Sequence, residues 1–133
     1  ISIYWLEHYN YSGKPPSPPR LRRGTLRTDG FVSVRARYEG GEFVTQPLRF
    51  EGNSLVINFS TSAVGWIKVE LQDQQGRPVP GFELGSSDEI YGDELARPVT
   101  WQGRTDVSAL AGKPVRLRFA MKDADLYSIR FVP

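Results

Sequence analysis

The feature that most constrains the fold is the alternation of apolar and polar residues in two runs within the stretch from Pro98 to Phe131. Two runs there place apolar side chains at every second position: Val115-Leu117-Phe119-Met121 and Tyr127-Ile129-Phe131. Successive residues of a β-strand point to opposite faces, so each run predicts a strand with one buried face. The link at residues 122–125 is short and carries turn formers. The stretch therefore predicts a closing antiparallel hairpin.

The same alternation recurs along most of the chain. It predicts further strands at residues 1–7, 30–38, 43–50, 54–60, 65–73, 79–84 and 97–101. Residues 85–96 read as an acidic loop, and residues 106–114 as a helical turn stopped by Gly112 and Pro114. About nine or ten short strands with almost no helical period predict an all-β fold, an antiparallel β-sandwich, with a jelly roll as the favoured topology.

The domain organisation follows from a proline-rich segment. Residues 10–19 contain four prolines, which cannot contribute to the interior of a sheet. We expect an N-terminal strand and Pro-rich linker over residues 1–19, and a β-sandwich module over residues 20–133. Because the chain is already strand-like at Ile1, we also expect it to be a piece of a longer polypeptide.

Charge and composition exclude several classes of function. A net charge of +2 without a dense Lys/Arg stripe argues against a nucleic-acid partner. No run of about twenty apolar residues is present, so we expect no membrane span. The chain has no cysteine, which removes disulfides, thiolate zinc sites and cysteine nucleophiles.

Catalytic and metal-binding patterns are weak. The only histidine is His8, and no nucleophile or orienting acid is placed around it, so we expect no catalytic residues. Four carboxylates, those of Asp88, Glu89, Asp93 and Glu94, cluster in one segment, but clustering is not placement across a cleft. Asp88, Asp93 or Glu94 are candidate calcium ligands, and we expect no other cofactor.

Aromatic residues are the better sign of binding. Trp101 lies two residues after Val99, on the same face of the predicted strand, and is predicted to lie in the core. Trp66 lies on the same strand face as Lys68 and Glu70, and the other face of that strand is apolar. Trp66 is therefore predicted to point outward. An exposed tryptophan often marks a contact surface, and sugar rings lie flat against indole faces.

Five arginines also occupy outward-facing positions of their predicted strands. They are Arg35, Arg37, Arg116, Arg118 and Arg130. If their strands share a sheet, these guanidinium groups form a basic face with Trp66 and Lys68, suited to an acidic or sulfated glycan. The alternative is that these charges only solvate the outer face.

Three segments carry a resemblance to a known module. LRTDGFVSV at residues 26–34, SALAGKPVRLRF at 108–119 and ADLYSIRF at 124–131 are similar to a C-terminal β-sandwich module. That module follows the catalytic propeller in bacterial proteins resembling family 32 glycoside hydrolases. The similarity covers most of the chain from residue 20 onward, and ISIYWLEHYNYS resembles the last propeller strand and its linker.

The matching positions are fold positions, not catalytic ones. Asp29, Gly30 and Phe31 match the strand entry of the module, and Leu110 and Gly112, with Asp106 before them, match its turn. The Asp nucleophile, Arg-Asp-Pro and Glu-Cys motifs of the propeller are missing. No catalytic residue of the family is therefore carried over.

The resemblance implies an accessory role in a carbohydrate-active enzyme. The expected function is non-catalytic binding of a polysaccharide or oligosaccharide, with the catalytic domain upstream in the same polypeptide. The alternative is a structural domain that packs on the propeller and stabilises it without binding glycan, through an apolar patch around the first strand. The resemblance also implies a secreted or periplasmic location, as part of a larger bacterial protein.

Overall fold

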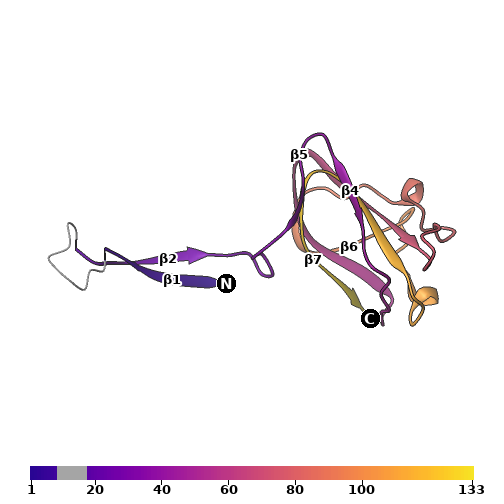
Figure 1. Cartoon of the computed structure of the whole chain (residues 1–133), viewed down its shortest axis with the longest axis horizontal. Helices are drawn as coiled ribbons and strands as arrows, with labels where there is room; N and C mark the ends of the chain where they lie inside the picture. The colour runs from indigo at the N-terminus through magenta and orange to yellow at the C-terminus, as the bar shows by residue number, and fades with distance from the viewer. Residues whose placement is uncertain (9–17) are drawn as a thin grey trace. The chain divides into compact units, whose positions relative to one another are not determined.

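The computed structural model describes residues 1–8 and 18–133 (Figure 1). Within these residues, seven strands pair antiparallel and no α-helix forms. The predicted all-β, antiparallel fold class is therefore confirmed. The chain divides into two compact units, Ile1–Phe31 and Val32–Pro133. None of the described residues forms a helix that is long and apolar enough to cross a membrane.

The first unit is a two-stranded hairpin. β1 (Ser2–Glu7) pairs with β2 (Arg20–Thr25), so the segment just after the predicted domain boundary groups with the N-terminal strand. Glu7 accepts a hydrogen bond from Nε of Arg22 at 2.9 Å. Most of the predicted proline-rich linker, residues 10–17, lies outside the described residues.

The second unit contains a five-stranded sheet. Its strands are β3 (Val34–Ala36), β4 (Gly41–Val44), β5 (Ser54–Gln72), β6 (Asp93–Pro98) and β7 (Arg116–Val132). The order is β3-β7-β5-β6, and β4 also pairs with β7. The long strands β5 and β7 thus form the centre of the sheet.

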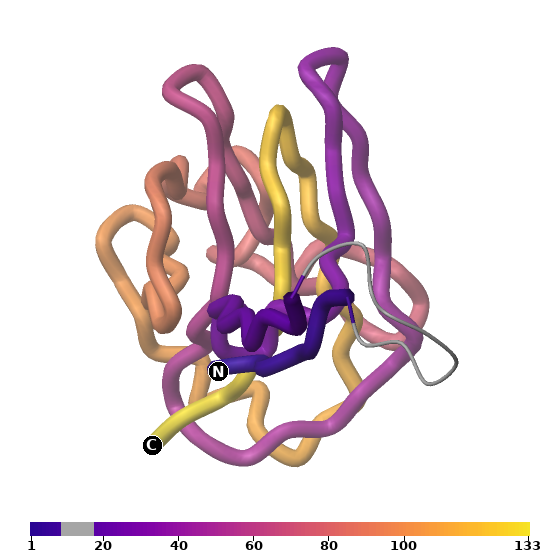
Figure 2. The backbone as a smooth tube through the Cα atoms, turned by 90° about the vertical axis from the view of Figure 1, so that its left-hand side faces the viewer, coloured from indigo at the N-terminus to yellow at the C-terminus, as the bar shows by residue number. Residues whose placement is uncertain are grey.

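Both long strands bend in the middle. Figure 2 shows the middle of β5, the middle of β7 and the β3–β4 connection as three narrow bends at the top of the view. In β5 the register with β7 shifts between Thr61 and Trp66, and in β7 Asp123 adopts a left-handed conformation with φ of 41°. Such irregularities bend a strand and let it pass from one layer to another.

The two halves of β5 enclose one core. Side chains from both halves belong to the same buried cluster: Leu55, Ile57 and Phe59, and Ile67, Val69 and Leu71. Trp101 is fully buried there, as predicted, and its indole N–H donates to the carbonyl of Val69 at 2.8 Å. The folded sheet therefore makes a sandwich-like body, while the jelly-roll topology stays a prediction.

The predicted closing hairpin is wrong. Its two apolar runs are the halves of one strand, β7, and they pair with β5 instead of with each other. Leu117 faces Leu71, and Ile129 faces Ile57. The predicted strands at 54–60 and 65–73 likewise merge into β5, and these two mergers lower the number of strands among the described residues. Alternation continues on both sides of a bend, so it does not distinguish a bend from a turn.

Several shorter predictions also need correction. Residues 79–84 form no strand: residues 79–83 are a loop, in which the N–H of Val79 bonds to the carbonyl of Leu71 at 2.9 Å, and Leu84 begins a 3-10 turn that ends at Ser86. The acidic segment predicted as a loop contains most of β6, an exposed edge strand. The strand predicted at 30–38 shortens to β3, and the strand predicted at 43–50 is replaced by β4, which begins at Gly41 and ends at Val44. The predicted helical turn is confirmed as a 3-10 turn at Ser108–Leu110.

Candidate functional site

The candidate site surrounds the bend that connects β3 to β4. The carbonyl of Arg37 accepts hydrogen bonds from the N–H of Gly40 at 2.9 Å and from the N–H of Asp123 at 3.0 Å. Gly40 has a φ of 83°, a conformation that glycine adopts without strain. The bend is therefore tied to the bend of β7, and two hollows adjoin it.

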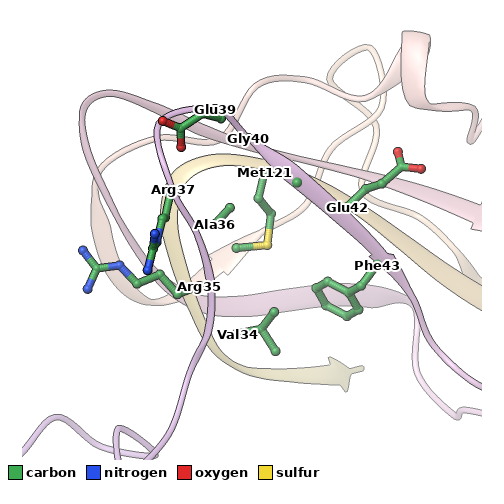
Figure 3. Close-up of a pocket in the computed structure, with 10 residues that line it drawn as sticks. Val34, Arg35, Ala36, Arg37, Glu39, Gly40, Glu42, Phe43 and Met121 are labelled. Carbon is green, nitrogen blue, oxygen red and sulfur yellow. The ribbon is translucent and has the colours of Figure 1, made fainter.

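The first hollow lies among the side chains of β3, β4 and β7 and has a volume of about 370 Å³ (Figure 3). Met121 and Phe43 face its interior, whereas the side chain of Arg35 extends away from them. Its apolar lining includes Val34 and Ala36. The charged residues that line it are Arg35, Arg37, Glu39 and Glu42.

The second hollow, of about 390 Å³, is lined by Trp66 and Lys122. These residues are direct partners across the β5–β7 pair, and the indole of Trp66 is half-buried. The ammonium group of Lys122 lies 4.4 Å from the centre of the Tyr38 ring, and that of Lys68 lies 6.0 Å from the Trp66 ring. The hollow thus combines an aromatic surface with nearby charges.

The two hollows share one edge. Five residues line both: Glu39, Gly40, Gly41, Glu42 and Met121. The β3–β4 bend therefore borders both hollows. We call the two hollows together the bend site.

A chain of ion pairs fixes one carboxylate of the bend site. Nη2 of Arg118 lies 2.7 Å from Glu42, and Nη1 lies 3.4 Å from Glu70, whose side chain is only 4% exposed. Glu70 also accepts hydrogen bonds from the Gln72 amide at 2.7 Å and from the Leu84 N–H at 2.9 Å. Arg118 is thereby held between two carboxylates, and Glu42 is anchored at the rim.

These contacts shift two pKa values. Burial raises the pKa of Glu70, but the hydrogen bonds from Gln72, Leu84 and Arg118 together outweigh burial and hold its pKa below the ordinary value. The hydrogen bond to Glu42 raises the pKa of Arg118. Both residues are therefore charged at neutral pH.

Three of the predicted binding residues, Trp66, Arg35 and Arg37, line the bend site. Trp66 and Lys68 on β5 share the outward face with Arg116 and Arg118 on β7, which face Gln72 and Glu70. Arg35 and Arg37 line the first hollow. Arg130 faces Val56 in the other half of β7 and takes no part in the bend site.

The predicted basic face is mixed in charge. Arg118 is paired with Glu42 and Glu70, as described above. Lys68 lies 3.4 Å from Glu89, and Arg35 lies 4.0 Å from Asp125. Nε of Arg116 donates to the carbonyl of Gln74 at 3.2 Å. Several of the cations that strand alternation places on the outer face therefore have carboxylates beside them.

Sequence reasoning missed three charged residues of this site: Glu39, Glu42 and Lys122. The sequence of residues 39–42 indicates only a turn, because two glycines between charged residues are typical of one. Lys122 was assigned to the link of a hairpin. Its place beside Trp66 depends on the register of β5 on β7, which periodicity does not reveal.

The carboxylates considered for calcium make other contacts. Asp88 accepts hydrogen bonds from the hydroxyl of Thr100 and the N–H of Gly103. The first of these is the main reason that the pKa of Asp88 lies below its usual range. Within residues 1–8 and 18–133, no group of three or more His, Asp or Glu side chains is placed to hold a metal ion.

No family model, no curated protein and no solved structure matches this chain. Its function is therefore inferred from the geometry of the bend site and from the surfaces of the two units.

Proposed function

We propose that the second unit is a non-catalytic carbohydrate-binding module, an accessory domain of a carbohydrate-active enzyme. The observation that carries this proposal is Trp66, whose half-buried indole lines a hollow beside Lys122 and two carboxylates. A flat aromatic surface with a few polar groups around it suits a sugar ring, which presents C–H groups on its face and hydroxyls at its edge.

The contacts that hold the bend site support this proposal. Trp66 and Lys122 are held by paired strands, and Glu42 is held by Arg118. Groups fixed before binding lose little conformational freedom when the ligand arrives. A sugar that stacks on Trp66 would therefore meet polar groups already in position.

Calorimetry against neutral, carboxylated and sulfated polysaccharides tests the proposal. We expect heat of binding for at least one polysaccharide, and a loss of affinity of about tenfold or more in Trp66→Ala. Trp5→Ala is the matched control, because Trp5 is an exposed tryptophan of the first unit and lies outside the bend site. If the whole panel gives no heat and no shift in melting temperature, the proposal is wrong.

A second role is favoured by the first unit: packing against a neighbouring catalytic domain of the same polypeptide. Exposed apolar side chains lie on both faces of the hairpin: Ile1, Ile3, Tyr4, Trp5, Leu6 and Leu21. An isolated two-stranded hairpin is marginally stable in water, and exposed apolar patches mark contact surfaces. This role would leave the chain structural, and it does not exclude glycan binding by the second unit.

Dye binding and hydrogen exchange on the chain alone test the second role. We expect the chain to bind a hydrophobic dye, with binding reduced in the double variant Trp5→Ser, Leu6→Ser. The amides of β1 and β2 should exchange much faster than those of β5 and β7. Slow exchange in the hairpin together with absence of dye binding would exclude an unpartnered apolar surface.

A further inference from the structure

We infer that the bend site takes an uncharged sugar and discriminates against sulfated or carboxylated glycans. This inference rests on the proposed function, because it concerns the ligand class of the same site. It departs from the acidic or sulfated glycan that the arginine pattern predicted.

The charges that line the two hollows do not favour an anion. The first hollow has two guanidinium groups, of Arg35 and Arg37, and two carboxylates, of Glu39 and Glu42. The second hollow has the same two carboxylates and one ammonium group, of Lys122. The formal charge of the lining is therefore zero in the first hollow and −1 in the second.

Two cations on the outward face of β5 and β7, which do not line the hollows, already have carboxylate partners. Arg118 lies between Glu42 and Glu70, and Lys68 pairs with Glu89. A sulfate group that approached either cation would meet its carboxylate at almost the same distance. Repulsion between like charges at that range offsets the attraction, and the partner of Arg118 on the inner side, Glu70, is buried and does not move away.

An uncharged sugar avoids this conflict. Its hydroxyl groups donate to carboxylates and accept from ammonium groups, so Glu42 and Lys122 both serve as partners while one sugar face covers Trp66. Hydrogen bonds to fixed charged groups are among the stronger ones. Mixed charges of this kind bind hydroxyls without requiring a net charge on the ligand.

Binding to two matched galactans tests the inference. We use neutral agaro-oligosaccharides and sulfated carrageenan oligosaccharides of equal length, together with a second pair, dextran and dextran sulfate. We expect wild-type protein to bind a neutral member at least about tenfold more tightly than its sulfated counterpart, with an affinity that salt hardly changes.

A charge-reversal variant sharpens the test. Glu39→Lys turns the lining of both hollows positive, so it should raise affinity for the sulfated member on the order of tenfold, in a salt-sensitive way. Glu51→Lys is the matched control, because Glu51 is an exposed glutamate outside the lining of both hollows. It should leave both affinities unchanged.

The outcomes separate the inference from the proposed function. Preference for the sulfated members that is lost in Trp66→Ala would overturn the inference and leave the proposed function standing. Absence of binding to both members of both pairs, and to the wider panel, would remove both. An equal gain in Glu39→Lys and Glu51→Lys would show that overall charge, not the bend site, sets the preference, and would also overturn the inference.

Discussion

At the scale of single residues, the bend of β5 depends on Gly65. A Cβ atom at this position would clash with the carbonyl oxygen of Asp123 and would lie 2.7 Å from that of Lys122. Both are backbone atoms of β7 at its own bend, so neither swings away as a side-chain end does. The close approach of the two bends, on which the place of Lys122 beside Trp66 depends, therefore requires glycine.

Gly65→Ala should lower the free energy of unfolding by about 2 kcal/mol or more, because the backbone of β5 or β7 must shift to admit the methyl group. Urea denaturation followed by circular dichroism measures this loss. Gly41→Ala is the control: a Cβ at Gly41 meets no atom within 4 Å, so the expected change is within about 0.5 kcal/mol. Equal effects of the two substitutions would contradict the role of Gly65.

A second residue-scale prediction concerns Trp101, which is fully buried and bonded to the carbonyl of Val69. Trp101→Phe removes the indole N–H and leaves that carbonyl without this donor in the core. The expected loss of stability is about 2 to 3 kcal/mol, from the unpaired acceptor and the smaller ring. Trp5→Phe, at an exposed tryptophan, should change the melting temperature little.

At the scale of elements, β4, β5 and β7 are joined by the chain Glu42–Arg118–Glu70. Glu70 on β5 and Arg118 on β7 are cross-strand partners, and Glu42 comes from β4 on the other side of β7. Such a network is sensitive to protonation, because a buried carboxylate that accepts three hydrogen bonds loses part of them when it takes up a proton.

The free energy of unfolding should therefore fall as the pH is lowered, and protonation of Glu70 should account for part of this fall. Its pKa is below the ordinary value of 4.5 in the folded state, so folding favours its ionised form. The stabilisation by ionised Glu70 is complete above the pKa that Glu70 has in the unfolded state. It is lost as the pH falls through the lower pKa that Glu70 has in the folded state. Wild-type protein should be more stable than Glu70→Gln at neutral pH, with a difference that shrinks below about pH 4.5. A difference independent of pH would show that titration of Glu70 contributes nothing.

At the scale of the whole molecule, the two units differ in the interactions that stabilise them. All buried apolar side chains of the described residues lie between Ala36 and Leu126, within the second unit. The hairpin of the first unit relies on its strand pairing and on exposed contacts such as the ion pair of Glu7 with Arg22. Exposed ion pairs contribute little, so the second unit should carry the stability of the chain.

Residues 32–133 alone should therefore fold cooperatively, with a melting temperature within a few degrees of that of the whole chain. Scanning calorimetry of both chains measures this, and titration with the same polysaccharide shows whether binding is retained. A fragment that fails to fold, or that melts far below the whole chain, would show that the first unit contributes to the core.

The sequence by itself determined which way side chains point. Trp101 is buried and Trp66 faces outward, because the direction of a side chain in a strand follows from local alternation. The fold class and the helical turn before β7 followed from equally local signals. Each of these needs only the few residues on either side.

Only the tertiary structure decided which strands are neighbours and where they bend. A bend at Asp123 and a hairpin turn there look the same in an alternating pattern, but they give different pairings. The pairing places Lys122 beside Trp66 and sets Glu42 and Glu70 on either side of Arg118. The arginines and lysines that the sequence pattern groups into one basic face lie beside carboxylates in the structure. These carboxylates are distant in sequence, and only the register between strands brings them close.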